Sequence, residues 1–102
     1  MFMSITIEGY EFEGPFTSTD SLKNLSGVYV IHYKNSEGKY TRLDVGESED
    51  VKDRVENHDR KNCWSRNAHG DITVSAYYCN ENERIKLEKI IRNSSSLPCG
   101  KI

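Results

Sequence analysis

The sequence contains no apolar run approaching the roughly 20 residues that span a bilayer, and it has no repeat or low-complexity stretch. Its 102 residues suffice for one domain, which we expect to cover residues 1–102. The segment from Met1 to Ile7 is short and mixed, and it lacks the basic and apolar parts of a signal peptide. We therefore expect a cytoplasmic protein that has no membrane partner.

An excess of basic residues is also missing. The chain has 14 Lys and Arg residues against 16 Asp and Glu residues, a formal net charge of −2 and a pI of about 5.9. A dedicated nucleic-acid binder is usually basic, because neutralising phosphates drives its affinity. The bulk charge therefore argues against tight nonspecific DNA binding, although it leaves room for a local basic face.

Cysteine is scarce, with only Cys63, Cys79 and Cys99 present. An odd number argues against a disulfide scaffold, so we expect reduced thiols. Together with His58 and His69, these cysteines offer the atoms that zinc prefers. They lack the paired Cys-x-x-Cys spacing of structural zinc sites, however, so zinc is not the favoured interpretation.

Three segments have the β-branched and aromatic composition of strands. Val28–Tyr33 is the clearest, and Lys39–Val45 follows it after the turn-forming residues 34–38, which predicts an antiparallel hairpin. Gly46 is expected to end the second strand. The third strand is expected over Ile72–Cys79.

The region 1–26 is predicted to lie outside this sheet. Ser4–Phe12 alternates loosely and is interrupted at Gly9, which is typical of a strand or an extended arm. Gly14-Pro15 indicates a turn, and a short helix over 21–24 is expected to follow it. We therefore predict an N-terminal arm and a short helix.

Capping residues predict two further helices. Ser48 is a plausible N-cap for a helix that runs to about His58, and Asn80 or Asn82 can begin another that ends near Arg92. The segment between the first of these helices and the third strand is expected to be irregular or briefly helical. The order of elements predicts an α/β chain of the α+β type, with a small three-stranded antiparallel sheet flanked by helices.

Short motifs occur in a characteristic order along the chain. Gly27-Val28-Tyr29 opens the first strong strand, and Asp44-Val45-Gly46 closes the second. Arg54 follows eight residues after the last glycine of that motif, and His58 lies one helical turn later. This order resembles the GIY-YIG nuclease superfamily, whose motifs are Gly-Ile-Tyr and Tyr-Ile-Gly.

The last predicted helix extends this resemblance. Residues 80–88 resemble the Glu-x-x-x-x-Glu helix of the excision-repair branch of the family, which makes Glu88 the implied metal ligand. The resemblance covers residues 27–98. It implies a GIY-YIG-like fold and metal-dependent hydrolysis of phosphodiesters in DNA or RNA.

The resemblance implies a role for each matched side chain. Glu88 would bind Mg²⁺ or Mn²⁺ through hard oxygen ligands, and the metal would stabilise the departing oxygen. Arg54 would hold a nonbridging phosphate oxygen. Tyr29 or His58 would take a proton from water.

Two positions depart from the family pattern. Asp44 stands where many members carry a tyrosine that positions the water. It can bind a second cation with Glu88, act as a base, or pair with Arg54 and silence the site. The family often ends in Pro-x-x-Asn, whereas Pro98 is followed by no matching asparagine.

Each of these side chains also has a plain structural interpretation. Tyr29 can be a core residue, Arg54 a surface ion-pair partner, His58 a hydrogen-bonding group at a helix end, Asp44 a strand cap, and Glu88 a partner of Arg84 or Arg92.

A nucleic-acid-binding patch is the last candidate. Trp64, flanked by Arg60, Lys61 and Arg66, can stack on a base beside basic residues, or it can be a core residue beneath a loop. Two functions remain open at this point: a small nuclease, or a noncatalytic module that binds nucleic acid or protein. A homodimer or a partner subunit would then supply the specificity that an appended domain usually gives.

Overall fold

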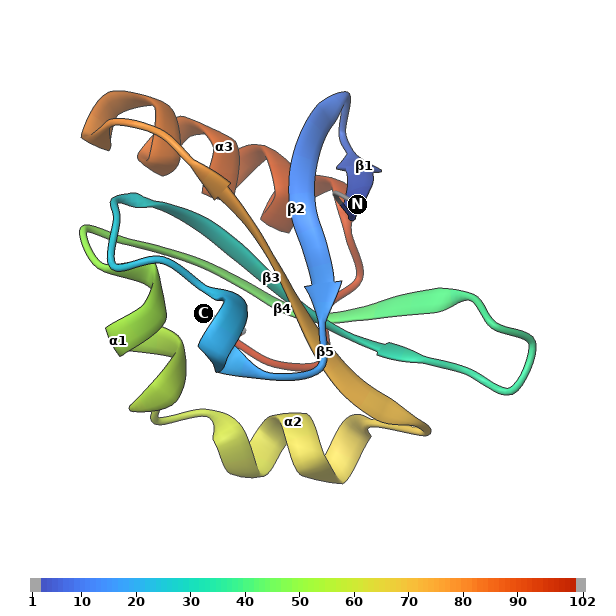
Figure 1. Cartoon of the computed structure of the whole chain (residues 1–102). Coiled ribbons are helices and arrows are strands. Elements are labelled where there is room, and N and C mark those ends of the chain that lie inside the picture. The colour runs from blue at the N-terminus through green and yellow to red at the C-terminus, as the bar shows by residue number, and fades with distance from the viewer. Residues whose placement is uncertain (1–2, 101–102) are drawn as a thin grey trace.

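The three predicted strands are neighbours in a sheet in the computed structural model, which describes residues 3–100 (Figure 1). Strand β3 (Gly27–Lys34) pairs antiparallel with β4 (Tyr40–Ser48) on one side and with β5 (Asp71–Tyr78) on the other. The predicted hairpin is therefore confirmed. Residues 1–2 and 101–102, which the predicted domain includes, lie outside the described residues.

Among residues 3–100 the sheet has five strands, so the prediction of three strands and a separate N-terminal arm is wrong. Strands β1 (Ser4–Ile7) and β2 (Tyr10–Phe16) form an antiparallel hairpin, and β2 pairs with β5 to give the order β1-β2-β5-β3-β4. The hairpin turns at Glu8 (φ 51°) and Gly9 (φ 83°). Two consecutive positive φ angles are typical of a tight hairpin turn, so Gly9 is a turn residue and not an interruption.

Gly46 lies inside a strand, contrary to the expectation that it ends one, because β4 continues to Ser48. The first helix, α1 (Val51–Glu56), is shorter than predicted, and its N-cap is Asp50, whose side chain accepts the Asp53 N–H. A second helix, α2 (Lys61–Asn67), occupies the segment expected to be irregular or briefly helical.

The other two predicted helices differ in outcome. Helix α3 (Glu81–Ser94) begins after Asn80, which caps it as predicted by accepting the Glu83 N–H. The short helix expected over 21–24 is instead a 3-10 turn, η1 (Thr19–Ser21). Ser18 caps this turn through its hydroxyl, a local hydrogen bond that favours a start earlier than the sequence pattern indicated.

The two faces of the sheet bury separate apolar clusters, because neighbouring residues of a strand point to opposite sides. Tyr29 and Ile31 of β3 pack with residues of α1 and α2, including Trp64. Val28 and Val30 pack on the other face with residues of α3 and of the β1–β2 hairpin. Figure 1 shows α3 on one side of the sheet and both shorter helices on the other.

The expectation of reduced thiols is wrong for Cys63 and Cys99, which form a disulfide with a Cα–Cα distance of 5.9 Å. Cys99 lies after α3, and its partner lies on α2, 36 residues earlier. Folding brings the two thiols together because the segment after α3 returns along β4, where the Cys99 N–H donates to the Leu43 carbonyl, and spacing alone does not reveal this contact. Cys79 is the free cysteine, and it is partly buried just beyond the end of β5.

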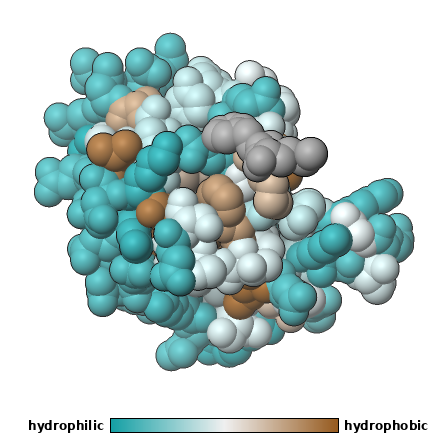
Figure 2. Space-filling view, viewed as in Figure 1, coloured by the Kyte–Doolittle hydropathy of each residue, from teal (hydrophilic) through white to brown (hydrophobic). Residues whose placement is uncertain are grey.

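Among residues 3–100, the exposed large hydrophobic side chains are Met3, Leu25, Tyr40, Ile85 and Ile90. Hydrophilic residues predominate on the face shown in Figure 2, and hydrophobic residues appear there as separate spots. Within residues 3–100, no helix has the length and apolarity to cross a membrane.

Candidate functional site

A pocket of about 350 Å³ lies where β3, β4 and α3 meet the segment from α1 to α2. Its wall combines a tyrosine hydroxyl, four cationic side chains and carboxylates. The residues that give it this character are Tyr29, Glu47, Arg54, Arg60, Glu88, Lys89 and Arg92. The structure therefore brings Tyr29, Arg54 and Glu88, which the sequence places far apart, around one hollow.

Tyr29 reaches this pocket because Gly46 lies directly opposite it on β4. A Cβ atom at Gly46 would overlap the ring and hydroxyl of Tyr29. The missing side chain thus leaves room for the tyrosine across the strand pair, and the tyrosine is only 1% exposed. The glycine of the Asp44-Val45-Gly46 motif therefore leaves the space that the Tyr29 side chain occupies.

His58 holds the Tyr29 hydroxyl from the side of α1. Its Nε2 lies 2.7 Å from the tyrosine oxygen, while its Nδ1 accepts the Arg60 backbone N–H at 3.0 Å. Burial, followed by the nearby Arg54 and Arg60, lowers the pKa of His58 to about 4. The ring is therefore neutral at pH 7, and because Nδ1 is an acceptor, the hydrogen-bond network assigns the proton to Nε2. His58 then donates to Tyr29 and has no free ring nitrogen.

The Tyr29 hydroxyl stays protonated at neutral pH. Burial raises the pKa of Tyr29 to about 12, although Arg54 and Arg60 act in the opposite direction. Since His58 donates to its oxygen, the hydroxyl proton of Tyr29 is free to point toward the pocket. Tyr29 can therefore donate a hydrogen bond to a ligand there.

Arg54 is the most accessible guanidinium of this group. Its Nη2 lies 2.8 Å from Asp59 Oδ1, and its side chain is 38% exposed. The hydrogen bond from Arg54 lowers the pKa of Asp59. An exposed ion pair of this kind contributes little stability, so a ligand anion can compete with Asp59 for Arg54.

Asp44 is fully buried and saturated with donors. Its carboxylate accepts Arg60 Nε at 2.8 Å and Trp64 Nε1 at 2.8 Å, and Arg92 Nη2 lies 3.4 Å away. The backbone N–H of Val45 also donates to it at 2.8 Å. Of the outcomes open for Asp44, pairing with an arginine occurs, but the partners are Arg60 and Arg92 and not Arg54.

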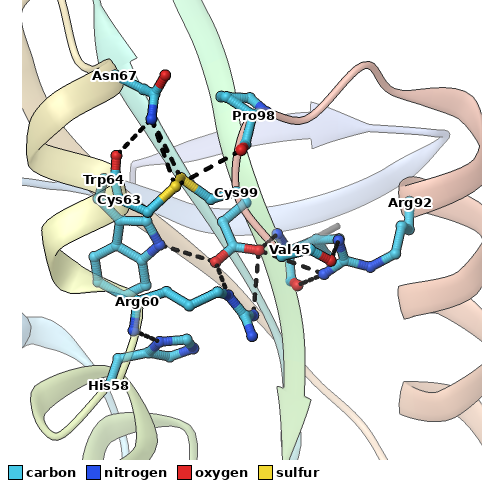
Figure 3. The surroundings of a disulfide bond; sticks show 11 residues. Val45, His58, Arg60, Cys63, Trp64, Asn67, Arg92, Pro98 and Cys99 are labelled. Atoms are coloured by element: carbon cyan, nitrogen blue, oxygen red, sulfur yellow. Dashed lines mark hydrogen bonds and ion pairs between the residues drawn. A yellow bond between two sulfur atoms is a disulfide. The ribbon is translucent and has the colours of Figure 1, made fainter. Parts of the chain in front are cut away.

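A β-bulge aims Asp44 into this network. The pairing of β3 with β4 shifts between Ile31 and His32, so that Leu43 is an extra residue. Leu43 and Val45 then enter different apolar clusters, and Asp44 lies between them at the sheet edge. Figure 3 shows Trp64 and Arg60 converging from the α2 side and Arg92 approaching from the α3 side.

Glu88 lies on the pocket wall in a pair with Arg92. The Arg92 Nε donates to Glu88 Oε2 at 3.0 Å, and both side chains are about one-fifth exposed, at 19% and 20%. The predicted alternative partner, Arg84, instead contacts Glu47 at 2.7 Å. Within residues 3–100, no three His, Cys, Asp or Glu side chains converge to hold a metal.

The four predicted nucleic-acid-binding residues lie in three different environments. Lys61 and Arg66 are exposed on α2, and Arg60 lines the pocket. Trp64 is only 5% exposed and packs against His58, with ring centroids 4.6 Å apart. Of the two interpretations of Trp64, the structure agrees with the core residue, because the core encloses its ring.

Sequence reasoning missed Lys89 as a pocket residue and gave Arg92 only a role as a partner of Glu88. Both lie on the face of α3 that also presents Ile85 and Glu88 to the pocket. These four residues are spaced by three, one and three positions, which is the spacing of one helix face. That periodicity was the available signal, and the family motif, which draws attention to a single glutamate, does not contain it.

No protein-family model matches the chain, and comparisons with curated proteins and with solved structures found no match either.

Proposed function

We propose that this protein hydrolyses phosphodiester bonds in DNA or RNA in a metal-dependent reaction of the GIY-YIG type. The observation that carries the proposal is that Tyr29, Arg54 and Glu88 line the same pocket. Phosphoryl transfer needs few covalent steps from the protein and depends mainly on positioning and charge stabilisation. A hydroxyl donor, guanidinium groups and a carboxylate around one hollow supply both.

Phosphate binding falls to the arginines and to Lys89. Arg54 can exchange its exposed partner Asp59 for a nonbridging phosphate oxygen, because the planar guanidinium forms paired hydrogen bonds with such oxygens. Arg60 is 30% exposed on the same wall. Asp44 fixes the orientation of Arg60 from behind, which reduces the entropy lost when a ligand binds.

Proton transfer is assigned to the ionised form of Tyr29, which is a small fraction of the protein at neutral pH because burial raises the pKa of Tyr29 to about 12. Both ring nitrogens of His58 are occupied, and the oxygens of Asp44 are buried and bonded, so neither group is free to accept a proton from water. Tyr29 lines the pocket and is the remaining member of the predicted set with an oxygen that can face a substrate. His58 is a positioning residue, because its Nε2–H stabilises the oxygen of Tyr29.

Glu88 is the residue that would hold Mg²⁺ or Mn²⁺. It offers a hard carboxylate on the pocket wall, and Mg²⁺ is often held by one or two carboxylates together with waters and substrate phosphates. The donor set is thus small but of the right chemistry. When bound, the metal would supply charge stabilisation at the departing oxygen. Arg92, which now pairs with Glu88, would have to yield part of that contact.

A second candidate function is a noncatalytic module that binds nucleic acid through the same pocket. The specific observation in its favour is Asp44. It replaces the tyrosine that positions water in the family, and it is bonded to Arg60, Trp64 and Arg92. In that role, Lys61 and Arg66 on α2 would extend the contact with the phosphate backbone. A homodimer or a partner subunit would supply sequence specificity.

Cleavage assays separate the two functions. Plasmid, single-stranded and branched DNA, together with a single-stranded RNA, are incubated with the protein and Mg²⁺ or Mn²⁺. Arg54→Ala should reduce cleavage by roughly 100- to 1000-fold if Arg54 stabilises the transition state. Arg42→Ala is the matched control, because Arg42 pairs with Glu8 and does not line the pocket.

The outcomes are distinct. Cleavage that is lost in Arg54→Ala and kept in Arg42→Ala supports the enzyme. Binding that weakens with salt, without cleavage of any substrate, supports the module. Cleavage that survives Arg54→Ala would reject the proposed site, because it would have to arise elsewhere on the protein or from a contaminant.

A further inference from the structure

The C-terminal segment 97–100, called the strap here, lies against the edge of the sheet beside the pocket. The Cys99 N–H donates to the Leu43 carbonyl of β4 at 3.0 Å, and Leu97 is buried in the α3-side cluster. Gly100 is itself a pocket-lining residue. The strap therefore covers backbone acceptors of an edge strand and also completes one wall of the pocket.

The strap holds Arg92. The Gly100 carbonyl accepts Arg92 Nη1 at 2.7 Å, while Nη2 of the same guanidinium donates to the Val45 carbonyl of β4. The remaining Nε donates to Glu88 at 3.0 Å. The side chain of Arg92 is thus fixed by the strap, the sheet edge and α3 together.

Gly100 fits this place because it has no side chain. Its φ angle is +75°, and a Cβ atom there would lie 2.6 Å from Asp44 Oδ1 and 2.9 Å from Arg92 Nη1. Contacts that close force the neighbouring groups to shift. The strap thus packs directly on the Asp44–Arg92 pair, so its position and the position of Arg92 depend on each other.

The disulfide fixes the strap to α2. Cys99 is 1% exposed, whereas Cys63 on α2 is half-buried, so an attacking thiolate reaches the sulfur of Cys63 first. Figure 3 shows the disulfide between α2 and the segment that contains Pro98 and Cys99, close to Trp64 and Arg60. The disulfide therefore links α2 to the strap, and Gly100 of the strap forms part of the pocket wall.

We infer that the strap is a positioning element of the pocket, and that the thiol state of Cys63 and Cys99 sets the arrangement of Arg92 and thereby the affinity for phosphate-bearing ligands. A dithiol reductant breaks the Sγ–Sγ bond, supplies two electrons and two protons to give two thiols, and is itself oxidised to a cyclic disulfide. Reduction removes the covalent link that holds Gly100 against Arg92. The affinity part of this inference rests on the proposed function, but the positioning part does not.

The first test is spectroscopic. Side-chain Nε–Hε and backbone amide NMR signals are recorded for the oxidised protein and for the protein with excess dithiol. We expect reduction to shift or broaden the Arg92 Nε–Hε and Cys99 amide signals and to speed hydrogen exchange at Cys99. An unchanged Arg92 Nε–Hε signal would overturn the inference, because the Cys99 amide responds to loss of its own disulfide in any case. Cys79→Ser is the control for thiol chemistry outside the strap.

A second variant tests the same contact without redox chemistry. Gly100→Ala keeps the disulfide but inserts a methyl group against Asp44 and Arg92. Gly9→Ala is its matched control, because Gly9 also has a positive φ (+83°) but has nothing within 4 Å of the added Cβ. Gly100→Ala should shift the Arg92 signal as reduction does, whereas Gly9→Ala should not.

Ligand binding completes the test, with a short fluorescein-labelled oligothymidylate as the probe and EDTA present to prevent cleavage. We expect reduction and Gly100→Ala each to weaken binding by roughly three- to ten-fold, the effect of freeing one immobilised side chain. A responsive Arg92 signal with unchanged probe affinity would overturn the affinity part. A responsive signal with no binding in either thiol state would support the strap as a positioning element and count against the proposed function.

Discussion

The two sides of the sheet are stabilised in different ways. On the α3 side, the buried cluster contains only aliphatic residues and one phenylalanine, such as Val28, Leu87 and Ile91. On the α1–α2 side, the cluster contains Tyr29 and Trp64, whose polar atoms bond to His58 and Asp44. The α3 side also buries one hydrogen-bonded pair, His32 with Ser75, but its cluster is apolar, whereas the cluster on the other side includes the polar atoms of Tyr29 and Trp64.

This difference determines where the molecule can hold oriented polar side chains. Within residues 3–100, the buried side-chain nitrogen and oxygen atoms all have hydrogen-bond partners. Burying a polar group whose hydrogen bonds are all made lowers stability little, but removing its partner lowers the free energy of unfolding substantially. The α1–α2 side can therefore hold an oriented tyrosine and two arginines at the pocket, and α3 contributes Glu88, Lys89 and Arg92 to the same pocket.

Asp44 gives the largest expected effect and compares the two sides directly. Asp44→Ala leaves Arg60 and Arg92 without their buried counter-charge, which should lower the free energy of unfolding by about 3–5 kcal/mol. Leu87→Ala, its counterpart on the apolar side, should cost about 2–5 kcal/mol through lost packing and a cavity. Urea denaturation measures both.

The NMR signal of Arg92 distinguishes these two variants. Asp44→Ala should also disturb the Arg92 Nε–Hε signal, whereas Leu87→Ala should leave it unchanged. A loss below about 1 kcal/mol for Asp44→Ala would mean that the buried network contributes little, and the contrast between the two sides would then fail.

Lowering the pH gives the next largest expected effect on stability, and it acts on both sides of the sheet. Burial lowers the pKa values of His58, bonded to Tyr29, and of His32, bonded to Ser75, to about 4 each. The unfolded chain takes up these protons near pH 6.5 and the folded chain only near pH 4, so the stability is complete above about pH 6.5 and is lost as the pH falls toward 4. The loss should reach at most roughly 3 kcal/mol per histidine.

Denaturation with urea between pH 7 and pH 4 measures this loss. His32→Gln should reduce the dependence of stability on pH by about one proton in that window. His69→Gln, at an exposed position, is the control and should leave it unchanged. A wild-type stability that does not change across the window would show that the two histidines are not buried in their neutral form.

The pH dependence of cleavage is the last of these effects and tests the assignment of Tyr29. Because the pKa of Tyr29 is raised to about 12, its ionised fraction increases about tenfold per pH unit near neutrality. If Tyr29 accepts the proton, the rate should rise about tenfold per pH unit, or roughly 100-fold between pH 7 and pH 9. A rate that reaches a plateau near pH 6–7 would instead point to a histidine.

Local features of the fold were predictable from the sequence. The hairpin of β3 and β4 follows from β-branched strands around a turn-forming loop, and the start of α3 follows from Asn80, because these signals lie within a few neighbouring residues. The pairing of β2 with β5 was missed, because it joins segments at opposite ends of the chain and the β1–β2 turn resembled an interruption.

The candidate site was predictable only in part, for the same reason. Spacing indicated Tyr29, Arg54 and Glu88. It could not indicate that Asp44 forms an ion pair with Arg92, which is 48 residues away, or that the disulfide joins cysteines 36 residues apart. These contacts depend on how the strap and α3 pack on the edge of the sheet. A one-residue bulge in β4 redirects Asp44 there, and no sequence pattern indicated that bulge.

We propose that Glu88 binds a metal and Arg54 binds phosphate, side by side with Tyr29 in one pocket. Crystals soaked with Mn²⁺ and examined by anomalous diffraction test it most directly. The account predicts a single Mn²⁺ bonded to the Glu88 carboxylate inside the pocket, with the Arg92 contact loosened, and no such peak in Glu88→Gln crystals. A wild-type crystal without Mn²⁺ at saturating concentration, in which Glu88 stays paired with Arg92, would contradict the claim.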